Sequence, residues 1–323
     1  MVKKFKGIGC PCVTPFNDDE SLNLTSLREL IDFLINSEIN AIIPTGNCGE
    51  SYSLSDEEYN QIIDTVVDQV NEAVPVYVGL PSENVHRILS IAKYAIDCGA
   101  DGLVVYPPKI SSLNVNELVN HFEFLSSNID GNLLIVNDPD STKIDLPVEL
   151  ISKLSKQSSI VGIIEVSNDF KKIPQISSSV RDDFRVYTGR GLLVPQAIKE
   201  GKVEGAIVPS ANVVPNLLVE LYEAYNVEMK DRFEELQTKL IPLEIGLKLG
   251  SFPTAIKASL NMLGVNVGSP RRPISKLQNG DIEKLRNILI SLGCLRPAIK
   301  EDEEEKLPPE ESEEKKQKTT KTK

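Results

Sequence analysis

Apolar residues in the first two thirds of the chain recur in two alternating patterns. Short runs rich in Val, Ile and Leu are each followed by a longer segment whose apolar residues repeat every three or four positions. The first pattern is typical of buried parallel strands, and the second of amphipathic helices that pack on them. Between residues 7 and 208 this alternation predicts βα units that repeat along the chain.

The repeat predicts the fold through the number of its units. Eight apolar runs are predicted as strands, at residues 8–14, 41–44, 76–79, 103–106, 133–136, 160–165, 184–188 and 206–208. Helices are predicted near residues 25–37, 55–72, 84–98, 115–127, 147–156, 168–179, 191–199 and 212–225. Eight such units in about 220 residues match a closed (β/α)₈ TIM barrel. An open doubly wound sheet would need a glycine fingerprint after its first strand, whereas that strand ends in Val13-Thr14-Pro15-Phe16.

Beyond residue 226 the pattern becomes purely helical. Apolar residues from Phe233 to Leu247 share one helix face, and further helices are predicted at 253–263 and 281–293. The last residues are rich in Pro, Glu and Lys and have no apolar periodicity, so they are expected to be disordered. The predicted domains are therefore a barrel (1–226), a C-terminal three-helix domain (227–295) and a charged tail (296–323).

Composition excludes several classes of function. Hydrophobic residues make up 41% and charged residues 25% of the chain, as in ordinary globular proteins. The net charge of -12, the 5% of aromatic residues and the absence of tryptophan argue against nucleic-acid binding. The sequence has no apolar run that would suit a signal peptide or a membrane span, so a cytoplasmic protein is expected.

The cysteines indicate reduced thiols, because they are scattered and odd in number. Cys10 and Cys12 flank a proline and could form a metal or redox pair. No second pair accompanies them, and the chain has only two histidines, so neither a metal nor a cofactor is expected.

A glycine-rich loop, Gly46 to Ser51, follows the second predicted strand. Such a loop displays backbone N–H groups that suit an anion, although a plain βα turn explains the glycines equally well. The helix after it has a clear start signal, with Ser55 as N-cap and Glu58 three residues later.

In a (β/α)₈ barrel the functional residues lie at the carboxyl ends of the strands. The polar residues predicted there are Asn47, Cys48, Tyr106, Lys109, Asn137, Asp138, Asp140, Glu165, Arg190, Ser210 and Asn212. Cys48 could have a lowered thiol pKa in its glycine-rich loop, but no histidine is near in sequence to act as its base. Asp138 and Asp140 could hold a cation or form a carboxylate pair, and Asp-Pro-Asp is also typical of turns. Glu165 could pair with a basic residue of the barrel wall or act on a substrate.

Four spaced segments carry a family resemblance. They are Gly46-Asn47-Cys48-Gly49-Glu50-Ser51, Leu134-Ile135-Val136-Asn137-Asp138-Pro139, Ile160 to Glu165, and Gly205 to Pro215. With the opening Pro11 to Phe16 and the later Pro253 to Lys257, they resemble the dihydrodipicolinate synthase / N-acetylneuraminate lyase family from Lys6 to about Leu295. The resemblance implies a (β/α)₈ barrel with a C-terminal three-helix domain, usually assembled as a tetramer of two tight dimers.

The family's chemistry is a class I aldolase reaction, in which a lysine on strand six forms a Schiff base with pyruvate or another 2-oxo acid. The resemblance places Ile164 at the lysine position and Val136 at the position of the proton-relaying tyrosine. Asn47 and Cys48 replace the two hydroxyl residues of the glycine loop that holds the pyruvate carboxylate. An imine cannot form on isoleucine.

Two further family positions also differ. The arginine at the mouth of the barrel falls on Ser141, and the tyrosine contributed across the tight dimer falls near Lys109. Arg190 adds a positive charge after strand seven. The candidate ligand-binding residues are therefore Asn47, Cys48, Lys109, Val136, Ser141, Ile164, Arg190 and Ile207, and no catalytic residue is assigned.

Two interpretations follow. In the first, the chain has no Schiff-base aldolase activity and acts as a binding, regulatory or subunit protein for a small carboxylate or 2-oxo acid. In the second, it is an active lyase or aldolase that uses Lys109 or Lys143, or an altered mechanism at the Asn47-Cys48 loop. A homodimer or homotetramer, or a hetero-oligomer with an active paralogue, is expected in both cases, without nucleic-acid or membrane partners.

Overall fold

The eight-fold repeat of the sequence closes into a barrel in the computed structural model, which describes residues 5–81, 84–110 and 113–296. Parallel strands form one sheet in the order β2-β1-β8-β7-β6-β5-β4-β3. A parallel bridge between Ile42 and Val76 joins β2 to the segment before β3 and completes the ring. The strands within the described residues are β1 (Gly7–Pro11), β2 (Ala41–Ile43), β3 (Tyr77–Gly79), β4 (Gly102–Val105), β5 (Leu133–Asn137), β6 (Ile160–Glu165), β7 (Arg185–Thr188) and β8 (Gly205–Ile207). The predicted (β/α)₈ barrel is confirmed.

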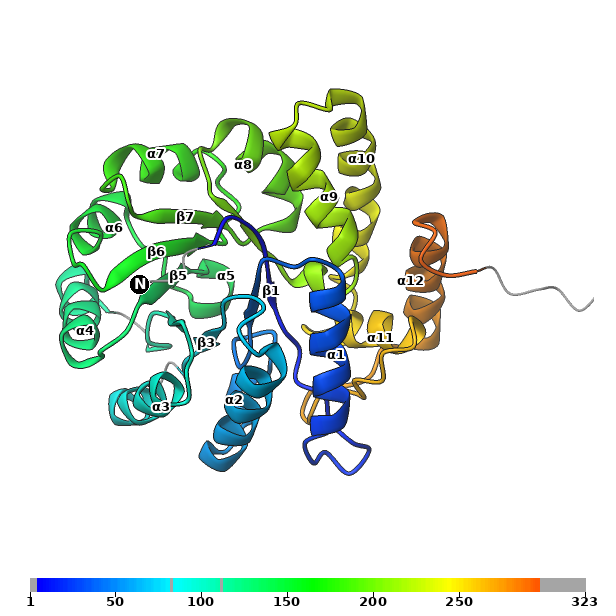
Figure 1. The fold of residues 1–323 in the computed structure, drawn as a ribbon, viewed down its shortest axis with the longest axis horizontal. Coiled ribbons are helices and arrows are strands. Elements are labelled where there is room, and N and C mark those ends of the chain that lie inside the picture. Colours follow the sequence, from blue (N-terminus) through cyan, green and yellow to red (C-terminus); the bar gives the residue numbers. More distant parts are fainter. Residues whose placement is uncertain (1–4, 82–83, 111–112, 297–323) are drawn as a thin grey trace, which may run out of the picture.

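Helices surround the strands on the outside of the ring (Figure 1). They are α1 (Leu24–Asn36), α2 (Asp56–Val70), α3 (Val85–Asp97), α4 (Val115–Asn128), α6 (Val148–Leu154), α7 (Lys172–Ser179), α8 (Val194–Glu200) and α9 (Pro215–Asn226). The short helix α5 (Pro139–Thr142) follows the carboxyl end of β5 and lies inside this circle of helices (Figure 1). Short 3-10 turns follow three of the strands, as η1 (Ser51–Ser53), η2 (Gly191–Leu193) and η3 (Pro209–Asn212). Among the described residues, none of the helices combines the length and apolar character that crossing a membrane requires.

The C-terminal helices lie beside the barrel, beyond α1 and α9 (Figure 1). They are α10 (Lys230–Gly246), α11 (Thr254–Met262) and α12 (Asn279–Ser291). α10 packs against α9 and α12, and α11 contacts η3 at the end of β8. The predicted boundary at residue 226 falls between α9 and α10. The predicted disorder of the tail concerns residues that, from 297 on, lie outside the described part of the chain.

The core has two layers, because successive strand residues point to opposite faces. One set packs outward against the helices, whereas the other fills the inside of the barrel. Near the amino-terminal end of β1, Phe5 stacks on Tyr187 with 4.7 Å between ring centroids, and the Tyr187 hydroxyl donates to the Phe5 carbonyl. These rings fill the barrel interior and leave the opposite, carboxyl-terminal end for a cavity.

Local differences from the predicted elements have physical reasons. β1 ends at Pro11 rather than at residue 14, because the Val13 N–H donates to the Asn212 side chain and the Phe16 N–H to the Val267 carbonyl. α9 begins at Pro215, which has no N–H to donate and suits a first helical position. α5 lies outside the predicted helices, because Asp-Pro-Asp is also typical of turns and the helix has only one turn.

Candidate functional site

A cavity of about 510 Å³ opens at the carboxyl ends of the strands. Its floor is aliphatic and consists of Ile43, Val104, Val136, Ile164 and Ile207, from five different strands. Val136 lies beside Ile164 in the β5–β6 register, and both are almost fully buried, at 2% and 5% exposure. The floor therefore offers apolar contact and no titratable group.

All eight residues proposed from the sequence line this one cavity. The structure brings together Asn47, Cys48, Lys109, Val136, Ser141, Ile164, Arg190 and Ile207. They come from the ends of six strands, because every strand of a parallel barrel delivers its following loop to the same face.

The glycine-rich loop is fixed from the neighbouring strands. The Asn47 side chain donates to the Ser141 hydroxyl at 2.9 Å, and the Asn47 N–H donates to the Tyr106 hydroxyl at 3.4 Å. Behind the loop, Thr14 donates to the Gly49 carbonyl at 2.7 Å. Part of the polar capacity of Asn47 is thus already used within the protein.

The helix after this loop begins where it was predicted, with Ser55 as its N-cap. The turn η1 separates the loop from α2, and the capping box forms as predicted: Ser55 accepts from the Glu58 N–H, and Glu58 accepts from the Ser55 N–H. Because these donors are satisfied locally, an anion in the cavity would meet the loop and not the helix end.

Cys48 is buried and lies beside the Asn212 amide, whose nitrogen is 3.7 Å from the sulfur. Burial raises the pKa of the Cys48 thiol well above its ordinary value, and the nearby Cys12 and Glu50 raise it further. The thiol is therefore protonated at neutral pH, which removes the basis for a nucleophilic Cys48. Cys10 and Cys12 are free and buried, and the Cys12 thiol donates to the Cys10 carbonyl.

The two aspartates after β5 have separate tasks. Asp138 caps α5 by accepting from the Ser141 N–H, and burial raises the pKa of its carboxyl. Asp140 forms an ion pair with Arg190, whose guanidinium is 3.1 Å from the Asp140 carboxylate. Asp138 and Asp140 are thus occupied by a helix start and an ion pair, and Arg190 is already partly neutralised.

The two lysines proposed as relocated nucleophiles differ in their position relative to the cavity. Lys109 lines the cavity with an exposed side chain, whereas Lys143 is exposed outside the cavity and donates to the Asp140 carbonyl. Lys248, which follows α10 and lies outside the predicted set, also lines the cavity. A relocated amine would therefore have to come from Lys109 or Lys248.

Three of the polar residues predicted at strand ends do not line the cavity, namely Asn137, Glu165 and Asn212. Asn137 donates to the Glu165 carboxylate at 3.0 Å and to the Asp145 carboxylate at 2.8 Å. Glu165 also accepts from the Ser167 N–H, and burial raises the pKa of its carboxyl. Glu165 thus accepts from the Asn137 amide and a backbone N–H in the barrel wall. Because it lies outside the cavity, its carboxylate does not face a ligand there.

Sequence reasoning missed the contribution of the C-terminal helices to the cavity. Glu244, Leu247 and Lys248 line it from the end of α10, together with Phe252 and Ile256. A signal for Glu244 exists, because it follows Leu240 by four residues and precedes Leu247 by three, which places a carboxyl on the apolar face of the helix.

The loop is also tied to the C-terminal helices through Glu50. Glu50 adopts a left-handed backbone conformation with φ of 56°, and its carboxylate is 2.5 Å from the Lys257 ammonium of α11. Both side chains are essentially inaccessible, at 0% and 1% exposure. The Lys257 ammonium also donates to the Ser269 carbonyl at 3.2 Å and lies 4.2 Å from the Phe16 ring centroid.

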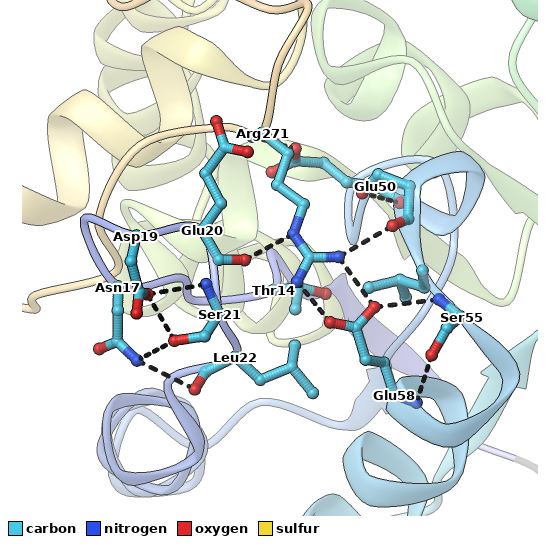
Figure 2. Close-up of polar contacts among 12 residues, drawn as sticks. Thr14, Asn17, Asp19, Glu20, Ser21, Leu22, Glu50, Ser55, Glu58 and Arg271 are labelled. Atoms are coloured by element: carbon cyan, nitrogen blue, oxygen red, sulfur yellow. Dashed lines mark hydrogen bonds and ion pairs between the residues drawn. The ribbon is translucent and has the colours of Figure 1, made fainter.

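Arg271 connects the same region to the start of α2 (Figure 2). Its backbone N–H donates to the Glu50 carboxylate at 2.9 Å, and its guanidinium forms an ion pair with Glu58. The guanidinium also donates to the carbonyls of Glu20 and Ser53. The loop that borders the cavity is thereby held on its far side by residues more than 200 positions away in sequence.

Comparison with known proteins identifies the family. The profile of the Dihydrodipicolinate synthetase family matches residues 4–292. The chain belongs to this family. Proteins named 4-hydroxy-tetrahydrodipicolinate synthase from Thermoanaerobacter sp. (strain X514) and Methanopyrus kandleri are each 32% identical to it. The former match covers 91% of this chain and 99% of the relative, and the latter 90% and 98%.

Solved structures of the family share the fold. The dihydrodipicolinate synthase of Thermotoga maritima superposes with a TM-score of 0.86 at 28% identity, covering 90% of this chain and 99% of that one. A dihydrodipicolinate synthase of Bacillus anthracis gives a TM-score of 0.87 at 26% identity, with coverage of 90% and 99%. The family resemblance noted from the four sequence segments is confirmed.

Proposed function

We propose that this member of the family binds a small carboxylate or 2-oxo acid in the barrel cavity without forming a Schiff base, and serves as a binding, regulatory or subunit protein. The observation that carries the proposal is Ile164, which ends in the cavity at the position where the family resemblance expects the lysine. Its register neighbours are Val136 on β5 and Tyr187 on β7.

The chemistry of the floor supports this proposal. Schiff-base formation needs a primary amine at the reacting carbon, and proton transfer needs a hydroxyl or another acid–base group within hydrogen-bond reach. Ile164 and Val136 provide neither. The cavity of about 510 Å³ still offers space and the polar side chain of Asn47 to a small ligand, although the amine and the tyrosine hydroxyl of the family pattern are absent at residues 164 and 136.

The second candidate is a lyase with a relocated lysine, and Lys109 favours it because its side chain lines the cavity. Relatives named as synthases at 32% identity support an activity on oxo acids. Against it stands the exposure of Lys109, because nucleophilic lysines are typically activated by desolvation in an apolar pocket.

Borohydride reduction in the presence of pyruvate separates the two candidates. We expect an unchanged intact mass for the wild-type protein, with Ile164→Lys as the positive control for trapping. A reduced adduct mapped to Lys109 or Lys248 in the wild type, and lost in the corresponding Met variant, would overturn the binding-protein proposal.

Binding itself is tested by titration calorimetry with pyruvate and longer 2-oxo acids. We expect weak binding, in the millimolar range typical of a site with few charged contacts. No heat and no thermal shift at saturating ligand would contradict the proposal. Assembly as a homodimer, a homotetramer or a hetero-oligomer with an active paralogue stays a prediction, which sedimentation of the purified chain and co-purification would test.

A further inference from the structure

Glu244 brings a carboxyl group from α10 into the wall of the cavity. Its Oε1 atom is buried and has no hydrogen-bond partner among the described residues, and the same holds for the Ser210 hydroxyl, which also lines the cavity. Buried polar atoms are nearly always paired in folded proteins. The Ser210 hydroxyl is close enough to the Glu244 carboxyl to lower its pKa, but no well-aligned hydrogen bond within the described part of the chain satisfies either atom, so both keep hydrogen-bonding capacity that a ligand would use.

Packing holds the Glu244 carboxyl in place. A Cβ atom built on Gly191 would lie 1.9 Å from the Glu244 Cδ and Oε1 atoms, so the carboxyl occupies the space of a side chain at Gly191. The carboxyl therefore presses against the loop after β7 and is not a freely moving surface group.

No cation in the described part of the chain forms an ion pair with Glu244. Arg190 is paired with Asp140, and Lys248, an exposed residue just after α10, lines the cavity without an ion pair to Glu244. Burial raises the pKa of the Glu244 carboxyl, while Ser210, Lys248 and Arg190 lower it only in part. Asp138, the other buried acid of the cavity, also has its pKa raised by burial. The charges of Lys248 and Arg190 act on Glu244, and that of Arg190 acts on Asp138, without an ion pair to either carboxyl among the described residues, and Ile164 supplies no charge from the floor.

We propose that the ligand of this cavity carries its own primary ammonium group, which donates to Glu244 and Ser210 while an aliphatic body packs on the floor of Val136, Ile164 and Ile207. The ligand class is a small aliphatic molecule with a primary amino group, which the carboxylate ligand of the proposed function would carry in addition to its acid group. This inference rests on the proposed role of the cavity as a ligand site. A hydrogen bond between two charged groups in a desolvated site is roughly twice as strong as one between neutral groups, so the ammonium should dominate recognition.

A matched pair of probes tests the ammonium requirement. 3-Methylbutylamine and 3-methylbutan-1-ol share one aliphatic body and differ in the charged donor alone. Titration of the full-length wild-type chain should show the amine binding at least about ten-fold more tightly than the alcohol, the ratio expected when an ion-paired donor replaces a neutral one. Equal affinities, tighter binding of the alcohol, or no binding of either probe would refute the inference.

A matched pair of variants assigns the effect to Glu244. Glu244→Gln keeps the shape that packs on Gly191 and removes the charge, and it should reduce the preference for the amine to within about two-fold. Glu234→Gln removes the same charge from an exposed position of α10 and should leave the preference unchanged. An amine preference that survives in Glu244→Gln would refute the assignment. Pyruvate titrations of the wild type run in parallel, so binding of pyruvate without amine preference would reject this inference and leave the proposed function standing.

Discussion

Replacing Lys257 by Met tests whether the C-terminal helices hold the cavity loop through a buried charge. In the folded protein the ammonium is 2.5 Å from the Glu50 carboxylate, and neither side chain is accessible to water. Methionine has nearly the same length and fills the same space. The substitution therefore removes the charge and the donors with little change in packing.

The magnitude follows from the surroundings of Glu50. After loss of the ammonium, its carboxylate keeps the Arg271 N–H as a donor and has no adjacent full charge of opposite sign at ion-pair distance among the described residues. Removing one partner of a buried ion pair typically costs about 3–5 kcal/mol, because the other charge stays desolvated and unpaired. Adding Glu50→Gln removes that stranded charge, and the double variant should recover roughly 1–3 kcal/mol of the loss.

Urea unfolding monitored by far-UV circular dichroism measures these differences, since the chain has no tryptophan to report on unfolding. Lys93→Met is the matched control, because Lys93 pairs with Asp97 at the surface with 77% of its side chain exposed. Such a pair is worth less than about 1 kcal/mol. The reasoning is refuted if Lys257→Met costs no more than Lys93→Met, or if Glu50→Gln in the same chain gives no recovery.

Three further predictions concern the cavity and its support. Ile164→Lys should form a borohydride-trappable pyruvate adduct without turnover and lose about 1–3 kcal/mol of stability; efficient aldol cleavage would contradict this. The hydrogen bond from Arg271 lowers the pKa of Glu58 in the folded protein. This hydrogen bond therefore stabilises the fold fully above the ordinary carboxyl pKa, and the stabilisation is lost as pH falls through the lowered pKa of Glu58. The stability difference between wild type and Arg271→Gln should therefore shrink in acid. In a Glu58→Gln background, which lacks the titrating carboxyl, the stability difference caused by Arg271→Gln should not shrink in acid. Iodoacetamide should label the exposed Cys294 well before the buried Cys48, which mass mapping would show.

Part of the site could be predicted because a barrel delivers its strand ends to one face. Once the eight runs were counted, Asn47, Ser141 and Arg190 had to approach one another, although they lie far apart in sequence. The direction of each side chain was harder to predict from the sequence. Glu165 ends its strand as predicted, and Asn137 ends β5 one residue beyond the predicted end. The two side chains bond to each other outside the cavity, because strand residues alternate between the two faces and a short strand leaves their direction unresolved.

The sequence by itself determined the elements and the absence of an amine at residue 164. Periodicity and capping depend on residues within about four positions of one another, which is why the Ser55–Glu58 capping box could be predicted. Tertiary structure alone decided which residues of the C-terminal helices reach the barrel. Glu244 in the cavity wall and Lys257 beneath the loop owe their roles to helix packing across some 200 residues of chain, and no local spacing encodes such a contact.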